Sequence, residues 1–274
     1  MSEKDKLSES GQFIQKMDGQ LLGWEHPAER LREALDHDHF RLYAQQVVAL
    51  QQETAVPGRI AMAEVLVRLR EEEARMLPPG DFLPAIELYR MMGELDRWVV
   101  RNALRKVGGN GKAGKLSVNV SGQTIEEPGF APFVAKQLRL ASLDAASLVI
   151  EIDESDAIDR RQAAERFAAE MKDIGCKLLL DGFARRSVSF EALKALRVDY
   201  VKVDGTIVRN ILRSASAAAK LKAIVRVGEM TGVGVIAECV EEETILAELK
   251  RLKAGYAQGF AVHRPAPIDE VLHP

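Results

Sequence analysis

Six polar residues recur along this chain near or just after the ends of short apolar segments. They comprise four carboxylates, one amide and one amine: Glu64, Asn119, Glu151, Asp181, Lys202 and Glu238. Each of them alone fits an ordinary solvated position, because charged side chains are seldom buried without a partner. Their repetition at successive strand ends instead indicates one shared site.

The residue types suggest what that site could do. Four carboxylates brought together would repel one another and raise each other's pKa unless cations lay among them. An asparagine beside them adds a neutral oxygen. Carboxylate and amide oxygens are the ligands of hard divalent cations, so the set suits magnesium, manganese or calcium.

Alternating apolar strands and amphipathic helices would position these residues. From residue 115 onward we expect strands at 115–120, 148–152, 176–180, 200–203, 233–237 and 257–260, with helices at 130–140, 161–174, 189–196, 216–230 and 242–252. This alternation predicts parallel βα units, and strands so continuously apolar favour a closed barrel. In such barrels, functional residues lie at the carboxyl ends of the strands.

The N-terminal half is predicted to differ from this pattern. Strands are expected at 40–50 and 60–69, and the turn signal Pro57-Gly58 between them indicates an antiparallel hairpin. Helices are expected from Pro27, over 78–92 and over 94–107. Residues 1–26 are polar and are interpreted as a linker or lead-in, similar to a junction with upstream regulatory domains, and residues 27–274 as one domain.

Composition excludes several classes of protein. A net charge of -3 provides no general basic field, which disfavours nucleic acid as a partner. Cys176 and Cys239 are far apart and form no CxxC motif, as expected for reduced thiols in a cytoplasmic protein. No apolar run approaches the roughly 20 residues of a membrane helix, and the N-terminus lacks the apolar segment of a signal peptide. We therefore expect a cytoplasmic location and no membrane span.

The ordered motifs of this chain resemble those of the EAL domains, which bind and often hydrolyse cyclic di-GMP. The resemblance covers about residues 27–272. It rests on Glu64-Val65-Leu66-Val67-Arg68 (E-A-L-x-R with Val for Ala), Ser117-Val118-Asn119-Val120-Ser121, Glu151-Ile152-Asp153-Glu154, Lys202-Val203-Asp204, Ala237-Glu238-Cys239-Val240-Glu241 and Gln258-Gly259-Phe260. It implies an α/β fold, a TIM-like (β/α)8 barrel with one antiparallel strand, in keeping with the predicted hairpin.

The resemblance also implies a role for individual residues. Active members hold two metal ions where this chain has Glu64, Asn119, Glu151, Asp181 and Glu238. Lys202 would orient the attacking water, and Arg68 would bind a ligand phosphate. The residues implied to lie near the guanines are Gln45, Leu66, Asp96 and Phe260.

One departure from the family pattern bears on activity. Active members carry D-D-F-G-T-G where this chain has Asp181-Gly182-Phe183-Ala184-Arg185-Arg186. The second Asp of that motif is a ligand of the second metal ion, and Gly182 has no side chain to replace it. Two-metal hydrolysis depends on both ions. We therefore expect no catalytic residues, and Lys202 and Glu238 would be vestigial. A vestigial or single-ion site for Mg, Mn or Ca would be formed by Glu64, Asn119, Glu151 and Asp181. Ligand binding would not require this ion.

Three functions follow as hypotheses. The first is a catalytically inactive receptor for cyclic di-GMP, similar to the FimX-type regulators of type IV pili and twitching motility, which also show an E-V-L variant; a PilZ-domain adaptor would then be a partner. The second is an active phosphodiesterase that yields the linear dinucleotide, since the other metal and water positions survive. The third is a protein-interaction domain that binds no nucleotide.

Overall fold

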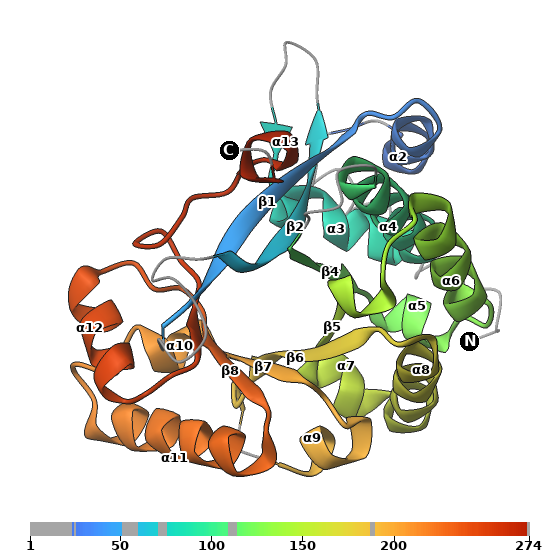
Figure 1. Ribbon diagram of the computed structural model, residues 1–274. Coiled ribbons are helices and arrows are strands. Elements are labelled where there is room, and N and C mark those ends of the chain that lie inside the picture. Colours follow the sequence, from blue (N-terminus) through green and yellow to red (C-terminus); the bar gives the residue numbers. More distant parts are fainter. Residues whose placement is uncertain are drawn as a thin grey trace, which may run out of the picture.

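The computed structural model describes residue 24 and residues 26–50, 60–70, 76–108, 114–186 and 190–272. Its centre is a single sheet in the order β10-β1-β9-β8-β7-β6-β5-β4-β2-β3, closed by pairing of β1 with β2 (Figure 1). The strands of the closed ring are β1 (Phe40–Ala49), β2 (Ile60–Arg70), β4 (Lys115–Val120), β5 (Leu148–Asp153), β6 (Lys177–Phe183), β7 (Tyr200–Val203), β8 (Gly234–Ala237) and β9 (Tyr256–Ala257). The two-residue strands β3 (Met76–Leu77) and β10 (Ala266–Pro267) extend it.

The first strand runs against its neighbours. β1 pairs antiparallel with β2 and with β9, whereas the ring from β2 through β4 to β9 is parallel. The predicted fold, a TIM-like (β/α)8 barrel with one antiparallel strand, is confirmed. The turn signal Pro57-Gly58 that suggested the hairpin lies outside the described residues.

Helices surround the barrel and bury one face each (Figure 1). The longer ones are α2 (Pro27–Asp36), α3 (Pro79–Leu88), α4 (Met92–Val107), α6 (Phe130–Ala141), α8 (Arg161–Ile174), α11 (Ala215–Thr231) and α12 (Glu243–Arg251), with the shorter α9 (Glu191–Leu196). In α8 the buried residues Ala164, Phe167, Ala168 and Met171 follow the spacing of one helical face. Such faces pack on the apolar outer surface of the strands, which is why the strands lack polar alternation.

Several short elements were not predicted. They are α5 (Gly122–Glu126), the 3-10 turn η2 (Ala145–Ser147), α7 (Glu154–Asp159), α10 (Gly205–Val208) and α13 (Ile268–Leu272). A helix of one turn has no apolar periodicity, and capping side chains determine where it begins. Ser121, Asp153 and Asp204 are the N-caps of α5, α7 and α10, and each directly follows a strand or ends one.

The last predicted strand is wrong in its extent. Pairing in β9 stops at Ala257, and Phe260 lies in a turn instead of in a strand. Gly259 has φ +153 and approaches the backbone of Val240 so closely that a Cβ would overlap it. The chain therefore leaves the sheet at this point. No helix in the described part of the chain combines the length and the apolarity that a membrane crossing needs.

Candidate functional site

The site is one layer of side chains above the apolar floor of the barrel. A small cluster of buried residues fills the interior: Val47, Met62, Val149, Leu179, Tyr200 and Ile236. Side chains two residues apart in a strand share a face. In the parallel strands, the residue two positions further along is polar in each case: Glu64, Glu151, Asp181, Lys202 and Glu238. In the antiparallel β1, the corresponding residue is Gln45, two positions before Val47. The strand period thus carries each of them into the barrel mouth.

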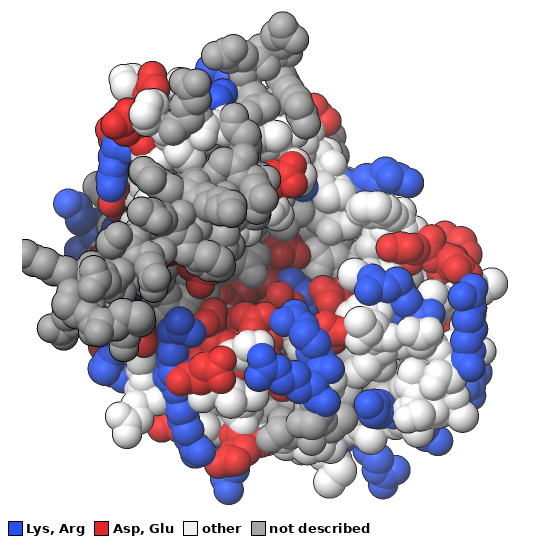
Figure 2. Space-filling model, turned by 180° about the vertical axis from the view of Figure 1, so that it is seen from behind, with Lys and Arg blue, Asp and Glu red and all other residues white. Residues whose placement is uncertain are grey.

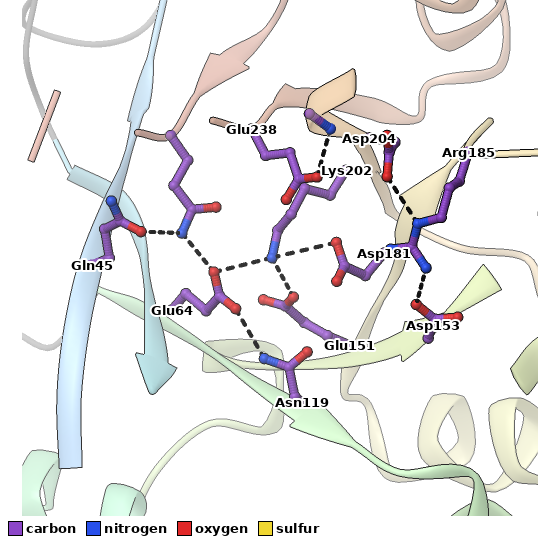
Figure 3. Close-up of polar contacts among 12 residues, drawn as sticks. Gln45, Glu64, Asn119, Glu151, Asp153, Asp181, Arg185, Lys202, Asp204 and Glu238 are labelled. Atoms are coloured by element: carbon purple, nitrogen blue, oxygen red, sulfur yellow. Dashed lines mark hydrogen bonds and ion pairs between the residues drawn. The ribbon is translucent and has the colours of Figure 1, made fainter. Parts of the chain in front are cut away.

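Lys202 is the centre of this layer (Figure 3). Its Nζ lies 2.5 Å from Glu151 Oε2, 3.1 Å from Glu64 Oε2 and 3.7 Å from Asp181 Oδ1. The side chain of Glu151 is 0% exposed and that of Lys202 is 2% exposed. One buried ammonium therefore offsets three carboxylates contributed by three other strands.

Amide side chains hold Glu64 in place. Asn119 Nδ2 donates to Glu64 Oε1 at 2.9 Å, and Gln258 Nε2 donates to Glu64 Oε2 at 2.6 Å (Figure 3). Gln258 also donates to Gln45 Oε1 at 3.3 Å, and Gln45 Nε2 donates to the carbonyl of His263 at 2.7 Å. The prediction from the sequence did not include Gln258 among the site residues, although the Gln258-Gly259-Phe260 motif could have indicated it.

Burial and like charges set the protonation of the cluster. Burial alone would raise the pKa of Glu64, but the charge of Lys202 and the hydrogen bonds from Gln258 and Asn119 outweigh it and lower that pKa. Glu151 is affected in the opposite direction: burial and then the charge of Glu64 raise its pKa to about 8, against the attraction of Lys202. The three carboxylates raise the pKa of Lys202 well above its usual value despite burial. The amine therefore stays charged, and burial with its neighbouring acids favours the protonated form of Glu151.

Glu238 lies beside this cluster and is bound by a helix start. Its Oε1 accepts a hydrogen bond from the backbone nitrogen of Gly205 at 2.7 Å, at the first residue of α10 (Figure 3). Burial, followed by the charge of Asp181, raises the pKa of Glu238 to about 7.

A second set of charges forms the rim of the mouth. Arg185 Nε donates to Asp204 Oδ2 at 2.9 Å, and Arg185 Nη1 donates to Asp153 Oδ2 at 3.2 Å (Figure 3). Glu154 accepts a hydrogen bond from the Ala184 nitrogen through Oε2 at 3.1 Å. None of these rim residues was predicted as part of the site, although Asp153, Glu154 and Asp204 stand in the motifs Glu151-Ile152-Asp153-Glu154 and Lys202-Val203-Asp204 that could have indicated them.

The predicted guanine contacts fall on two sides of the cluster. Leu66, Asp96 and Asn119 line a mainly apolar cavity of about 450 Å³ together with Leu83 and Pro84. Asp96 Oδ2 accepts hydrogen bonds from the Ser121 nitrogen and hydroxyl and from the Thr124 hydroxyl. Burial raises the pKa of Asp96 to about 6 against those hydrogen bonds.

Arg68 and Phe260 stand apart from the network. Arg68 donates to the carbonyl of Val67, and its guanidinium lies 5.4 Å from the centroid of the Tyr43 ring. No carboxylate within the described ranges forms an ion pair with Arg68, so its charge is available to a ligand. Phe260 is 51% exposed, with the Arg264 guanidinium 4.6 Å from its ring centroid.

The carboxylate cluster around Lys202 meets only some of the requirements of the divalent cation that its residue types suggest. Glu151 Oε1 and Asp181 Oδ1 are buried oxygens without a hydrogen-bond partner, as expected of ligands that await a cation. Among the residues that the structure places, however, no group of three or more His, Cys, Asp or Glu side chains is arranged to hold an ion. Glu64 Oε2, Glu151 Oε2 and Asp181 Oδ1 instead face the amine of Lys202, so these carboxylates would have to turn from it to bind one ion.

The residues around the expected position of a second ion do not fit an ion there. Gly182 provides no ligand and has φ +65, and a Cβ built there would overlap Arg185 Nη2 and lie 2.8 Å from its Cζ. An arginine side chain therefore occupies the space into which a second carboxylate would project.

The fold and the site together place the chain in the class of (β/α)8-barrel proteins with a carboxylate cluster at the carboxyl ends of the strands. Comparison with known families matches residues 28–265 to the EAL domain. The chain belongs to the EAL domain family.

Individual relatives agree with this assignment. Cyclic di-GMP phosphodiesterase PdeB of Shewanella oneidensis is 31% identical over 244 residues, which cover 88% of this chain and 28% of PdeB. Cyclic di-GMP phosphodiesterase PdeF of Escherichia coli is 28% identical over 247 residues, covering 89% of this chain and 32% of PdeF. The chain thus spans about a third of the length of these curated relatives.

A similar solved structure is the EAL domain of FimX from Pseudomonas aeruginosa bound to c-di-GMP. It superposes with a TM-score of 0.80 at 29% identity and covers 86% of this chain and 95% of that chain.

Proposed function

We propose that this domain binds cyclic di-GMP as a receptor and does not hydrolyse it. The observation that carries the proposal is the replacement of a second-ion ligand by Gly182, with Arg185 in the space that remains. Hydrolysis with two metal ions needs one ion for the attacking oxygen and one for the leaving oxygen. Without a place for the second ion, binding can persist while turnover is lost.

The geometry of the mouth supports nucleotide binding. Arg68 has no acid partner in the described structure and offers a planar pair of donors, which suits a phosphate group. The cavity lined by Leu66 and Asp96 is mainly apolar with a few polar groups, as expected for a site that takes a flat base. The chain resembles the FimX EAL domain, whose solved structure holds c-di-GMP, and PdeB, which is named a cyclic di-GMP phosphodiesterase.

One divalent ion is compatible with this function. Glu64, Asn119, Glu151 and Asp181 would hold it, and it would neutralise the acids that otherwise repel the phosphates. Lys202 already supplies part of that charge, so we propose that the ion assists binding and is not required for it.

Calorimetry with product analysis tests the receptor proposal. The purified domain is titrated with cyclic di-GMP in magnesium buffer, and the recovered nucleotide is separated by chromatography. We expect saturable heat and intact nucleotide, with affinity about 10- to 100-fold weaker for Arg68→Ala, the loss expected when a charged hydrogen bond is removed. Saturable heat with linear product would instead establish an enzyme.

An active phosphodiesterase remains the second candidate, because Glu64, Asn119, Glu151 and Lys202 are retained and two relatives carry that name. Sustained heat and accumulation of the linear dinucleotide would support it. A domain that binds no nucleotide and acts through protein contacts alone would give no heat in the same titration.

The cellular context is also a proposal. From the resemblance to FimX-type regulators we propose a role in type IV pilus and twitching motility regulation, with a PilZ-domain adaptor as the first partner to test. Pull-down with such an adaptor, with and without cyclic di-GMP, measures whether the nucleotide changes its binding. Equal recovery in both conditions would contradict a receptor that signals through this partner.

A further inference from the structure

The guanidinium of Arg185 is held over Gly182 by acids from two other elements. Asp153 ends β5 and Asp204 follows β7, and they accept hydrogen bonds from Nη1 and Nε of Arg185. The Arg185 side chain is 46% exposed, whereas that of Asp204 is 8% exposed. Two anchoring acids thus orient a cation whose remaining surface faces solvent.

One nitrogen of this guanidinium has no hydrogen-bond acceptor among the described residues. Nη2 is the atom nearest to Gly182, and none of the described residues accepts a hydrogen bond from it. Arginine presents five donors in a fixed fork, so anchoring through Nε and Nη1 leaves donors on Nη2 for a further acceptor. An oxyanion such as a phosphate provides acceptors of matching geometry.

The charge around the mouth explains why a cation matters there. Acidic side chains gather in a hollow at the centre of the face seen in Figure 2, with basic side chains beside them. Glu64, Glu151, Asp181 and Glu238 face a single amine, Lys202. An anionic ligand would be repelled from this hollow unless further cations offset the acids.

We infer that Arg185 takes the place of the second divalent ion in this domain and binds a phosphate group of the nucleotide. The inference rests on the proposed function, because it assumes that a cyclic dinucleotide is the ligand. Arg185 supplies one fixed positive charge where an ion would supply two. It cannot activate water, since a guanidinium stays protonated and offers no open coordination position.

Nucleotide binding tests the phosphate contact. Titrations with cyclic di-GMP compare the wild type, Arg185→Ala and Arg186→Ala, each in magnesium and in EDTA. Arg186 is the adjacent exposed arginine and has no hydrogen bond or ion pair with any residue placed in the structure, so it is a matched control for net charge. We expect Arg185→Ala to weaken binding about tenfold or more in both buffers and Arg186→Ala to change it by less than about twofold.

Equal affinities for wild type and Arg185→Ala would overturn the phosphate contact. An equal loss in both alanine variants would do so as well, because net charge and not the position of Arg185 would then be the cause. Arg185→Lys keeps the charge without the planar fork, and we expect its affinity to lie between those of wild type and Arg185→Ala.

Counting bound ions tests whether Arg185 occupies the place of an ion without reference to nucleotide. Manganese binding to the nucleotide-free domain is measured by calorimetry and by the electron paramagnetic resonance signal of free Mn²⁺. We expect no additional ion for Gly182→Asp, because the introduced carboxylate would pair with Arg185. The double variant Gly182→Asp/Arg185→Thr, in which the carboxylate has no cationic neighbour, is expected to bind one more ion than the wild type.

Two results would contradict this part of the inference. One is an additional ion in Gly182→Asp with Arg185 still present, and the other is no additional ion in the double variant. If the wild type gives no heat with cyclic di-GMP, the receptor proposal and the phosphate contact both fail, while the manganese counts still decide whether Arg185 replaces an ion.

Discussion

The centre and the rim of the barrel mouth use charge in different ways. At the centre, the side chains of Lys202 and Glu151 are 2% and 0% exposed and are fixed by neighbouring strands. At the rim, the side chains of Arg185 and Asp153 are 46% and 33% exposed and lie where strands give way to loops and short helices. A charge that water can still reach costs little to add or remove, whereas a buried charge depends on its partners.

Part of the departure from the EAL pattern lies at this exposed rim. The buried residues Glu64, Glu151 and Lys202 match the family, whereas the exposed Arg185 and Arg186 depart from it, as do the buried Gly182 and Ala184. The ion pairs of Lys202 are with Glu64, Glu151 and Asp181, so neither exposed arginine takes part in them. The proposed phosphate contact of Arg185 would therefore leave the ion pairs of Lys202 in place.

Removing the central amine should have the largest effect. Lys202→Met would leave Glu64 and Glu151 buried without their cation, so we expect the free energy of unfolding to fall by about 3–5 kcal/mol. Urea unfolding at pH 7, followed by circular dichroism, measures this loss. Lys106→Met is the control, because Lys106 and Asp269 form an exposed pair whose loss should cost less than about 1 kcal/mol. Similar small losses in both variants would contradict the contrast between a buried and an exposed charge.

Stability of the metal-free domain should fall as pH rises from 5 to 8. The folded state holds a proton on Glu151 up to about pH 8, on Glu238 up to about pH 7 and on Asp96 up to about pH 6, whereas an ordinary Glu releases it near 4.5 and an ordinary Asp near 3.8. The folded state therefore binds more protons than the unfolded state in this window, and stability decreases by up to about 1.4 kcal/mol per pH unit for each proton. Urea unfolding at each pH unit in EDTA measures the slope.

Glu238→Gln is the matched variant for this pH dependence. It removes the titration of Glu238 and leaves those of Glu151 and Asp96, so we expect a shallower slope between pH 5 and 7 and little change between 7 and 8. A wild-type stability that is flat or rises over this range would show that the raised pKa values of the central carboxyls do not govern it.

At the rim, the largest expected effect comes from Glu154, the member with a buried contact. Glu154→Ala leaves the buried nitrogen of Ala184 without its acceptor, which should cost about 1–3 kcal/mol. Glu154→Gln keeps an acceptor oxygen and should stay within about 1 kcal/mol of wild type. Chemical denaturation of both variants separates the hydrogen bond from the charge, and equal losses would show that the charge matters more.

The smallest expected change is the effect of Arg185→Ala on stability. Its ion pairs with Asp153 and Asp204 are partly exposed on the arginine side, so we expect a change within about 1 kcal/mol in urea unfolding. The same variant is expected to lose about tenfold or more in nucleotide affinity. A large loss of stability would place Arg185 with the centre and would make its binding data uninformative about a phosphate contact.

The barrel and the layer of functional side chains could be read from the sequence. Apolar strands alternating with amphipathic helices predict parallel βα units, and the two-residue period of a strand places Glu64, Glu151 and Lys202 on the same inward face as Met62, Val149 and Tyr200. Ordered motifs added the family. These features are local, because they depend on periodicity within single segments.

The partners of each charge were decided only by the tertiary structure. Lys202 lies 51 residues from Glu151 along the chain, and nothing in either strand indicates that the two side chains meet or that the proton favours Glu151 over Glu64. The sequence showed Gly182 as a missing ligand. It could not show that Arg185 fills the space, because that depends on acids at the ends of β5 and after β7, which closure of the barrel brings to one side of the mouth.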